Sequence, residues 1–240
     1  MKPIVLTLFI IPFLLILSPN KEPYNSNIVV LELFTSQGCS SCPAADAILN
    51  EVKSENIIAL SYHVDYWNYI GWKDPFSKSK YSDKQRKYAV KFNSSSIYTP
   101  QLVINGKEHI VGSNKKLLNQ KIEQYKMIKS KSHIFVSKVS KSEDQVRFSY
   151  NFEGDISNKN FRIILVVNER KTSVKRGENR NREIVNGNIV VNEQQFKLEN
   201  NSGIGSILIP EIVTPTDDLS LILIIENDDL DIATASYTAL

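Results

Sequence analysis

The stretch Gly38-Cys39-Ser40-Ser41-Cys42-Pro43 contains both cysteines of this 240-residue chain. It follows residues 28–34, a bulky apolar run without alternation that is typical of a strand covered on both faces. It precedes residues 44–49, which begin a helix that we expect to run to about residue 54. Pro43 suits the first turn of that helix, because a proline there loses no helical hydrogen bond. The sequence therefore predicts a Cys-x-x-Cys pair at a strand-to-helix turn.

The composition excludes several classes of protein. A formal net charge of +3, from 29 basic and 26 acidic residues, is too small to indicate nucleic-acid binding. Three scattered histidines and two cysteines cannot form a closed structural zinc site. One cysteine pair also cannot staple a chain of this length, so a small disulfide-rich scaffold is excluded. The class that remains is an ordinary globular protein with one unusual pair of cysteines.

The N-terminus predicts export. Lys2 precedes residues 4–17, an apolar run without charge that ends at Ser18-Pro19-Asn20. This pattern is typical of a secretory signal, and the run is short for a membrane-spanning helix. We therefore expect residues 1–20 to be a signal peptide, with an uncleaved N-terminal anchor as the alternative. The protein is then secreted or periplasmic, or tethered to a membrane, and the cysteines meet an oxidising compartment.

The first half of the chain alternates between strand and helix patterns. Residues 57–62 predict a second strand, so the cysteine turn lies within a β-α-β unit whose strands pair in parallel. A Cys-x-x-Cys pair in such a unit is typical of a thioredoxin-like site. The later expected elements are a loop over 63–76, a helix over about 78–92, a hairpin over 101–111 that turns at Asn105-Gly106, and a helix capped by Ser113.

The pattern changes after about residue 129, where strand-like runs are separated by polar turns. Seven such runs at short intervals predict an antiparallel sandwich. They cover residues 134–139, 145–152, 161–167, 188–191, 206–209, 219–225 and 233–238. The predicted fold class is thus an α/β thioredoxin-like domain, residues 27–129, followed by an all-β sandwich-like domain, residues 130–240.

The two cysteines are the candidate catalytic residues. A helix N-terminus favours thiolate over thiol, and Cys39 lies at the exposed end of the turn, so we assign it as the attacking thiolate. Cys42, one turn further in, then resolves the mixed disulfide. The alternative is a structural disulfide or two inert thiols. Bracing of the turn is a weak explanation for this pair, because a disulfide that closes so small a loop removes little entropy from the unfolded chain.

Thr99-Pro100 is the candidate substrate-binding element. Most X-Pro bonds are trans. An upstream Cys-x-x-Cys and a following Leu-Val-Ile-Asn-Gly hairpin nevertheless favour a cis bond here, opposite the dithiol. In that arrangement the backbone beside the cis-proline pairs with a bound substrate.

His63 and Asp65 follow the second predicted strand, at the sheet edge that also carries the cysteines. Either side chain could transfer a proton for Cys42, or Asp65 could cap the loop. A metal site of Cys39, Cys42 and His63 is a second alternative, since two thiolates and an imidazole suit Cu(I) or Zn(II). Copper-delivery proteins usually space their cysteines more widely, which counts against this alternative.

Three stretches resemble a family of bacterial secreted proteins of unknown function: Glu32-Leu-Phe-Thr-Ser-Gln-Gly-Cys-Ser-Ser-Cys-Pro, Ser61-Tyr-His-Val-Asp-Tyr-Trp and Tyr98-Thr-Pro-Gln-Leu-Val-Ile-Asn-Gly. Arg176-Gly177-Glu178-Asn179, within a charged cluster over 170–183, is similar to a further motif of that family. The resemblance implies a thioredoxin-like, glutaredoxin-resembling domain and a dithiol site, and it implies no substrate. A run of charge is usually a solvated loop, but this motif suggests a loop that folds onto the dithiol domain.

The sequence thus predicts an exported thiol–disulfide oxidoreductase that needs no cofactor beyond a redox-active Cys39–Cys42 disulfide. Its expected partners are protein or small-molecule thiols and disulfides, and not nucleic acid. The alternatives are a copper or zinc delivery protein that uses the same thiols, and a non-catalytic binding module with an inert disulfide.

Overall fold

Apolar runs between polar turns become strands, and the amphipathic stretches become helices. The computed structural model describes residues 28–240. Its helices are α1 (Cys42–Val52), α2 (Ser79–Lys91) and α3 (Lys115–Lys126), with a 3-10 turn at Asn68–Ile70. Its strands are β1 (Val29–Thr35), β2 (Ile57–His63), β3 (Gln101–Ile104), β4 (Glu108–Val111), β5 (His133–Lys141), β6 (Gln145–Glu153), β7 (Lys159–Ser173), β8 (Glu183–Lys197), β9 (Ser202–Leu208), β10 (Leu219–Asn227) and β11 (Ile232–Ala239).

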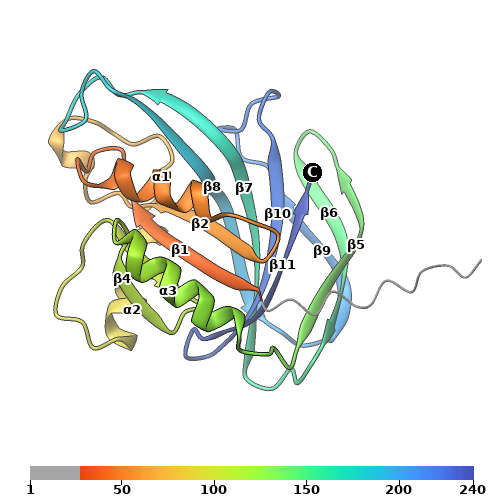
Figure 1. Ribbon diagram of the computed structural model, residues 1–240. Coiled ribbons are helices and arrows are strands. Elements are labelled where there is room, and N and C mark those ends of the chain that lie inside the picture. Colours follow the sequence, from red (N-terminus) through yellow and green to blue (C-terminus); the bar gives the residue numbers. More distant parts are fainter. Residues whose placement is uncertain (1–27) are drawn as a thin grey trace, which may run out of the picture.

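Two sheets organise the described chain (Figure 1). The larger sheet is mixed and has the strand order β11-β10-β7-β8-β2-β1-β3-β4. The smaller sheet is antiparallel, with the order β5-β6-β9. Strands β1 and β2 pair in parallel, and Thr35 and His63 face each other at the end of their register. The predicted β-α-β unit is therefore confirmed.

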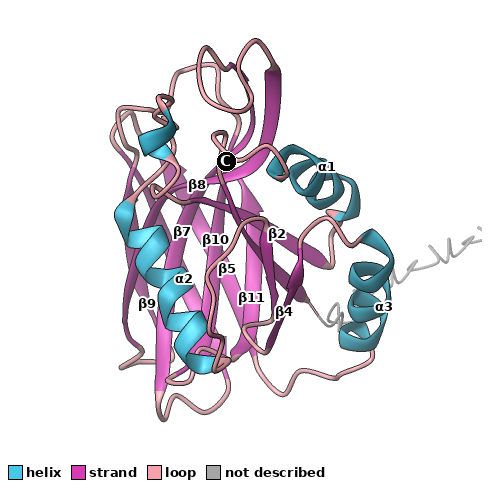
Figure 2. Ribbon diagram, turned by 90° about the vertical axis from the view of Figure 1, so that its left-hand side faces the viewer, coloured by secondary structure: helices cyan, strands magenta, loops and turns pink. Residues whose placement is uncertain are grey.

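The two faces of the large sheet bury different apolar sets. One face packs against α1 and α3 over β1–β4, and against the small sheet over β7, β8 and β10. The opposite face of β1, β2 and β7 packs against α2. Figure 2 shows α2 on one side of the sheet, with α1 and α3 on the other. Since strand side chains alternate between faces, the odd-numbered residues Thr35 and His63 point toward α1.

The β3–β4 hairpin turns at Asn105-Gly106 as predicted, and both residues have a positive φ, 49° and 69°. The expected cap of α3 is wrong by one residue. Asn114 caps that helix, because its side-chain oxygen accepts a hydrogen bond from the Leu117 N–H at 3.1 Å.

The predicted fold class, an α/β thioredoxin-like domain followed by an all-β sandwich-like domain, is wrong. Six of the seven predicted runs after residue 129 fall within strands, and the run 206–209 ends one residue beyond β9. Four of the seven strands, however, extend the large sheet instead of closing a separate sandwich. The connection is β8, which lies parallel to β2 and pairs with it through Ser61 and Ile189. The Ser61 hydroxyl also donates to the Gly187 carbonyl at 2.8 Å. By covering the free edge of β2, β8 makes one sheet from both halves of the chain.

The expected boundary near residues 129 and 130 stays a prediction, and so does the signal peptide or anchor, since residues 1–20 lie outside the described residues. Within residues 28–240, no helix has both the length and the hydropathy to cross a bilayer.

Candidate functional site

The cysteine pair lies where α1 begins. Cys42 is the first residue of α1, Pro43 occupies its first turn, and a disulfide joins Cys39 to Cys42. Cys39 and Cys42 are only 1% and 0% exposed, whereas Ser40 and Ser41 between them are exposed. The disulfide is therefore buried just below a polar surface turn, and the expectation that Cys39 lies at the exposed end of this turn is wrong.

The peptide bond between Thr99 and Pro100 is cis. The carbonyl oxygen of Thr99 lies 3.8 Å from the sulfur of Cys39, so the fold brings the predicted substrate-binding element against the predicted nucleophile. The Trp67 indole fixes this segment by donating to the Thr99 hydroxyl at 2.8 Å.

His63 ends β2 in a buried pair with Asp74. Its Nδ1 lies 2.7 Å from Asp74 Oδ2, both side chains are 0% exposed, and His63 Nε2 has no hydrogen-bond partner. Burial opposes protonation of His63, but the charge of Asp74 and this hydrogen bond outweigh it and raise the pKa of His63. Burial likewise favours the neutral form of Asp74, but His63 outweighs it and lowers the pKa of Asp74. Both shifts favour the form of the pair in which His63 is an imidazolium and Asp74 a carboxylate.

Asp46 is a buried carboxyl group that the sequence analysis missed. It lies one helical turn after Cys42, so the two side chains are neighbours on one face of α1. Asp46 Oδ2 accepts a hydrogen bond from the Thr35 hydroxyl at 3.2 Å, and Asp46 Oδ1 has no partner. Burial raises the pKa of Asp46 to about 7, although the charge of His63 opposes this rise. An Asp four residues after a cysteine on an apolar helix face was the signal available in the sequence.

Asp65, the other predicted proton-transfer residue, forms its hydrogen bonds with Ser82 of α2. The Asp65 N–H donates to the Ser82 hydroxyl at 3.2 Å, and this hydroxyl donates to the Asp65 carboxylate. These contacts match a role in capping the loop.

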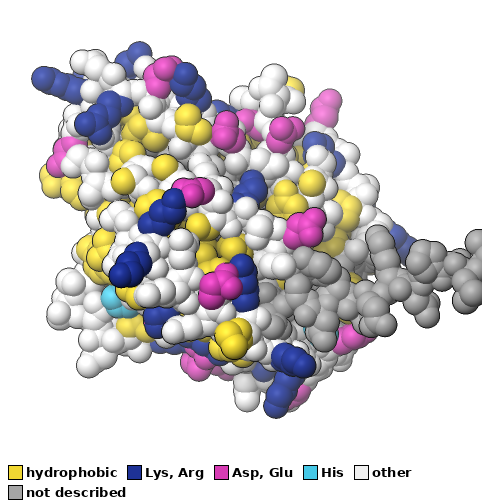
Figure 3. Space-filling view, in the orientation of Figure 1, with side chains coloured by type: hydrophobic (Ala, Val, Ile, Leu, Met, Phe, Trp, Pro, Cys, Tyr) yellow, Lys and Arg dark blue, Asp and Glu magenta, His cyan; other side chains and the backbone are white. Residues whose placement is uncertain are grey.

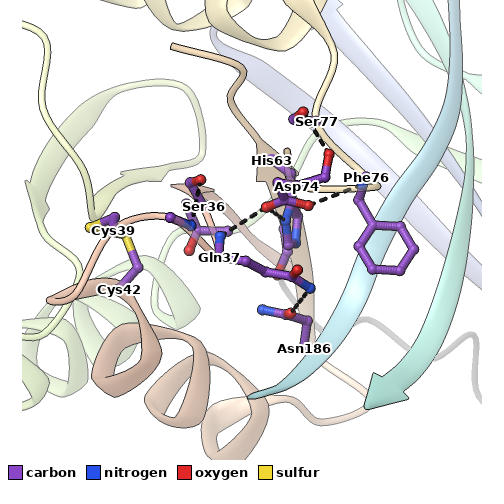
Figure 4. Close-up of polar contacts among 12 residues, drawn as sticks. Ser36, Gln37, Cys39, Cys42, His63, Asp74, Phe76, Ser77 and Asn186 are labelled. Carbon is purple, nitrogen blue, oxygen red and sulfur yellow. Dashed lines mark hydrogen bonds and ion pairs between the residues drawn. A yellow bond between two sulfur atoms is a disulfide. The ribbon is translucent and has the colours of Figure 1, made fainter. Parts of the chain in front are cut away.

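Gln37 connects the cysteine turn to the His63–Asp74 pair (Figure 4). Its N–H donates to Asp74 Oδ2 at 2.8 Å, and its side-chain amide donates to Asn186 at 3.0 Å. Its side-chain oxygen accepts from the Trp72 indole at 3.2 Å. Each contact joins a different segment, so Gln37 fixes the turn in a buried polar network.

A loop from the far half of the chain covers the cysteine turn. We call residues 174–182, between β7 and β8, the strap. The Asn179 side chain is fully buried and donates to the carbonyl oxygens of Gln37 and Cys39, at 3.0 and 2.9 Å. The Glu178 carboxylate accepts the Ser40 N–H at 2.8 Å. The Arg176–Asn179 motif therefore folds onto the cysteine turn, as the sequence suggested.

The strap is strongly basic. Figure 3 shows basic side chains gathered at the corner where Figure 1 places the end of the β7–β8 hairpin. The strap contains four exposed basic residues and one acid, Glu178, and the basic residues are Lys175, Arg176, Arg180 and Arg182. A concentrated positive charge thus lies beside the disulfide.

The alternative metal site finds no support in the described chain. The two cysteines form a disulfide, and His63 Nδ1 is hydrogen-bonded to Asp74. Within residues 28–240, no group of three or more His, Cys, Asp or Glu side chains is placed to hold a metal ion.

The fold and site define a protein with a buried disulfide at a helix N-terminus, within a mixed sheet that spans both halves of the chain. Residues 30–225 match the family described as "Protein of unknown function (DUF1223)". The chain belongs to this family, which confirms the resemblance to a family of unknown function.

Two solved structures resemble the whole fold. A protein from Agrobacterium tumefaciens, solved by X-ray crystallography, is similar with a TM-score of 0.63 and 26% identity, over 88% of this chain and 93% of that one. HBP35 of Porphyromonas gingivalis is similar with a TM-score of 0.61 and 13% identity, over 90% of this chain and 76% of that one. A comparison with curated proteins finds no match.

Proposed function

We propose that the protein catalyses thiol–disulfide exchange at Cys39 and Cys42, on partner proteins or small thiols. The observation that supports this function is the placement of the disulfide at the start of α1, with the sulfur of Cys39 3.8 Å from the Thr99 carbonyl beside a cis-proline. Free N–H groups at a helix N-terminus stabilise a thiolate. A disulfide that only braced a turn would gain nothing from a neighbouring strand end that can pair with a bound polypeptide.

The exchange balances in two steps. The Cys39 thiolate attacks one sulfur of a partner disulfide, and the other partner sulfur leaves as a thiolate. The Cys42 thiol then loses its proton and attacks the Cys39 sulfur, which expels the second partner thiolate and forms the Cys39–Cys42 disulfide. The partner gains two electrons and the protein loses two. The same steps in reverse oxidise a partner dithiol, and the two reduction potentials decide the direction.

Asp46 supplies the acceptor for the Cys42 proton in this scheme. It is adjacent to Cys42 on α1, has a free carboxylate oxygen, and has a pKa of about 7, close to the ambient pH at which proton transfer is most efficient. The His63–Asp74 pair lies on the same face of the sheet, and the charge of His63 stabilises the ionised form of Asp46. We assign His63 to this supporting role, and the proton-transfer role of Asp65 stays a prediction.

In this scheme the strap moves when a partner binds. A partner sulfur must approach Cys39, which is 1% exposed with the strap in place. Withdrawal of residues 174–182 uncovers the carbonyl groups of Gln37 and Cys39 for a bound polypeptide. The basic residues of the strap favour partners that carry acidic residues near their disulfide.

Export of the protein is part of the proposal. The apolar run over residues 4–17 supports a signal peptide or anchor, and an oxidising compartment supplies disulfide partners. Fusion of residues 1–30 to a reporter that is active only outside the cytoplasm tests this point.

Insulin reduction by dithiothreitol tests the function, with wild type, Cys39→Ser and Ser40→Ala compared. We expect wild type and Ser40→Ala to accelerate the reaction, and Cys39→Ser to give the uncatalysed rate. A Cys42→Ala variant should accumulate mixed disulfides, because the resolving thiol is missing. Equal rates for wild type and Cys39→Ser, with no trapped partner, would establish an inert disulfide instead.

A further inference from the structure

The strap presents a carboxylate to the N-terminus of α1, beside the disulfide. Glu178 Oε2 accepts the Ser40 N–H at 2.8 Å, and Ser40 directly follows Cys39. The first turn of α1 contains no acidic residue, and the Ser41 side chain makes no capping hydrogen bond. Glu178 is therefore the anionic group that meets the positive end of α1 in the disulfide form.

The same position is where a Cys39 thiolate obtains its stabilisation. A thiolate at a helix N-terminus depends on nearby N–H groups and on the positive helix end. In the disulfide form the Cys39 sulfur is neutral, so no second negative charge competes with Glu178 for the N-terminus of α1. After reduction, the Glu178 carboxylate binds the N–H of Ser40, the residue that directly follows the Cys39 thiolate. Two negative charges so close together destabilise each other.

Docking of the strap depends on few contacts at this end. Asn179 donates to the carbonyl oxygens of Gln37 and Cys39, and Glu178 accepts from Ser40. Two of these three bonds involve Cys39, which is reduced, and Ser40, which directly follows it. Hence a charge that appears at the Cys39 sulfur acts directly on the bonds that hold the strap.

We propose that Glu178 is a positioning residue that holds the strap over the disulfide, and that formation of the Cys39 thiolate displaces it. The oxidised protein is then closed and the reduced protein is open to a partner. This inference rests on the proposed function for its purpose, but the coupling itself requires only chemical reduction. Dithiothreitol supplies two electrons and two protons to the Cys39–Cys42 disulfide and becomes a cyclic disulfide, and Cys39 then releases its proton to solvent.

Other charged groups around the turn act equally in every variant compared. They are Asp46 on α1, His63 on β2, Asp74 before α2, and the four basic residues of the strap, Lys175, Arg176, Arg180 and Arg182. The Arg182 guanidinium donates to the Asn179 side-chain oxygen at 3.1 Å. Glu178→Gln keeps the size of the side chain and its acceptor oxygen, and removes only the charge. Glu183→Gln is the matched control, because Glu183 lies on the same hairpin outside the strap and pairs with Lys171.

The first readout is amide hydrogen exchange of residues 174–182 in the disulfide form and in the form reduced by dithiothreitol at pH 8. In wild type and Glu183→Gln we expect reduction to accelerate exchange by at least about tenfold, as expected for loss of a hydrogen bond to a charged group. In Glu178→Gln the exchange rate of the reduced form, divided by that of the disulfide form, should be close to one. Equal exchange in both forms of wild type, or an unchanged ratio in Glu178→Gln, would overturn the inference.

The second readout is the pH profile of iodoacetamide alkylation at Cys39, measured in a Cys42→Ser background. Removal of the Glu178 charge should move the midpoint to lower pH by a few tenths of a unit, whereas Glu183→Gln should leave it in place. A midpoint that stays constant in Glu178→Gln would contradict the charge competition. Neither readout uses insulin reduction, so a failure of the proposed function and a failure of this inference are distinguishable.

Discussion

Asp46 combines two properties that rarely occur together, a carboxyl group that is 3% exposed and a side-chain oxygen without a partner. An ionised carboxylate is costly in such surroundings, so the group takes up a proton at a much higher pH than a solvated Asp. Folding thus stabilises the protonated form of Asp46. This single side chain makes the stability of the protein depend on pH near neutrality.

We expect Asp46→Asn to flatten that dependence. The pKa of Asp46 rises from 3.8 to about 7 on folding, so its contribution to stability is fully present below pH 3.8 and is lost as the pH rises to about 7. The full loss is on the order of 4 kcal/mol. An asparagine never ionises, so the variant should gain about 2–3 kcal/mol relative to wild type between pH 5 and pH 8. Urea unfolding across this range measures the difference.

Asp83→Asn is the control for this measurement, because Asp83 is an exposed Asp on α2. Its profile should run parallel to that of wild type. If the stability profile of Asp46→Asn also runs parallel to that of wild type, folding does not make Asp46 harder to ionise, and this prediction is wrong.

The sequence identified some site residues and missed others for physical reasons. Cys39, Cys42 and Pro100 are rare residue types in a diagnostic spacing, so they could be found without the fold. Asp46 and Gln37 are ordinary residues whose role depends on burial. The spacing of a sequence does not encode burial by segments more than a hundred residues away.

At the scale of elements, the turn between β3 and β4 meets the turn between β10 and β11. The Ile232 N–H donates to the Asn105 carbonyl at 2.9 Å, and the Asn105 side chain accepts from the Val30 N–H at 2.7 Å. A Cβ on Gly106 would lie 1.9 Å from the carbonyl oxygen of Leu230, and the φ of Gly106 is +69°. Only glycine allows the two turns to approach so closely.

Gly106→Ala should therefore destabilise the protein by about 2–4 kcal/mol, from backbone strain together with a clash against a backbone atom. Gly71→Ala provides the comparison, because Gly71 also has a positive φ, +90°, but a Cβ there meets nothing within 4 Å. Gly71→Ala should show only the cost of backbone strain, about 1–2 kcal/mol. Guanidinium unfolding of both variants tests this, and equal losses would show that the two turns separate freely.

Elements were easier to predict than their partners. Residues 188–191 indicated a strand, and that strand exists, but nothing in its apolar pattern indicated that β2 would be its neighbour. Period and turn signals depend on local geometry, whereas pairing depends on which free edge remains when the chain folds. The sandwich prediction failed at this step, and the covering of the cysteine turn by the strap was foreseen only from the Arg176–Asn179 motif.

At the scale of the molecule, one buried guanidinium joins both halves of the chain. Arg162 of β7 is fully buried beneath α2. It donates to Glu32 of β1, Tyr62 of β2, Glu193 of β8 and Glu226 of β10, at 2.6, 2.7, 2.7 and 2.8 Å. Four strands of the large sheet thus each direct a polar side chain at one charge.

We expect Arg162→Met to cost about 3–5 kcal/mol at pH 7, because it leaves the buried Glu226 without a cation and weakens the pairing of the buried Glu32. Addition of Glu32→Gln should recover part of this loss, since it removes one of the buried charges that Arg162 neutralises. Arg86→Met, which removes an exposed arginine paired with Asp83, should change the free energy of unfolding by less than about 1 kcal/mol. A similar small change for Arg162→Met would contradict the joining role.

Acid should destabilise the protein as Arg162→Met does, because protonation removes the charge of a carboxylate that pairs with Arg162. Burial favours the neutral form of Glu193, but the charges of Lys84 and Arg162 outweigh it and lower the pKa of Glu193 to about 2. A carboxyl group with a lowered pKa stabilises the fold above its unfolded value of 4.5, and this stability is lost as the pH falls toward 2. The acid-unfolding curve of Arg162→Met should be correspondingly shallow in this window.

The strap also has a consequence for the order in which the protein is made. Asn179 and Cys39, which it joins, are 140 residues apart in the sequence. At about 5–20 residues per second, the ribosome completes the strap roughly 7–30 s after the cysteines. During that interval the nascent chain presents an uncovered dithiol turn. The cysteines of each newly made molecule therefore meet the thiols and oxidants of their surroundings before the rest of the chain can cover them.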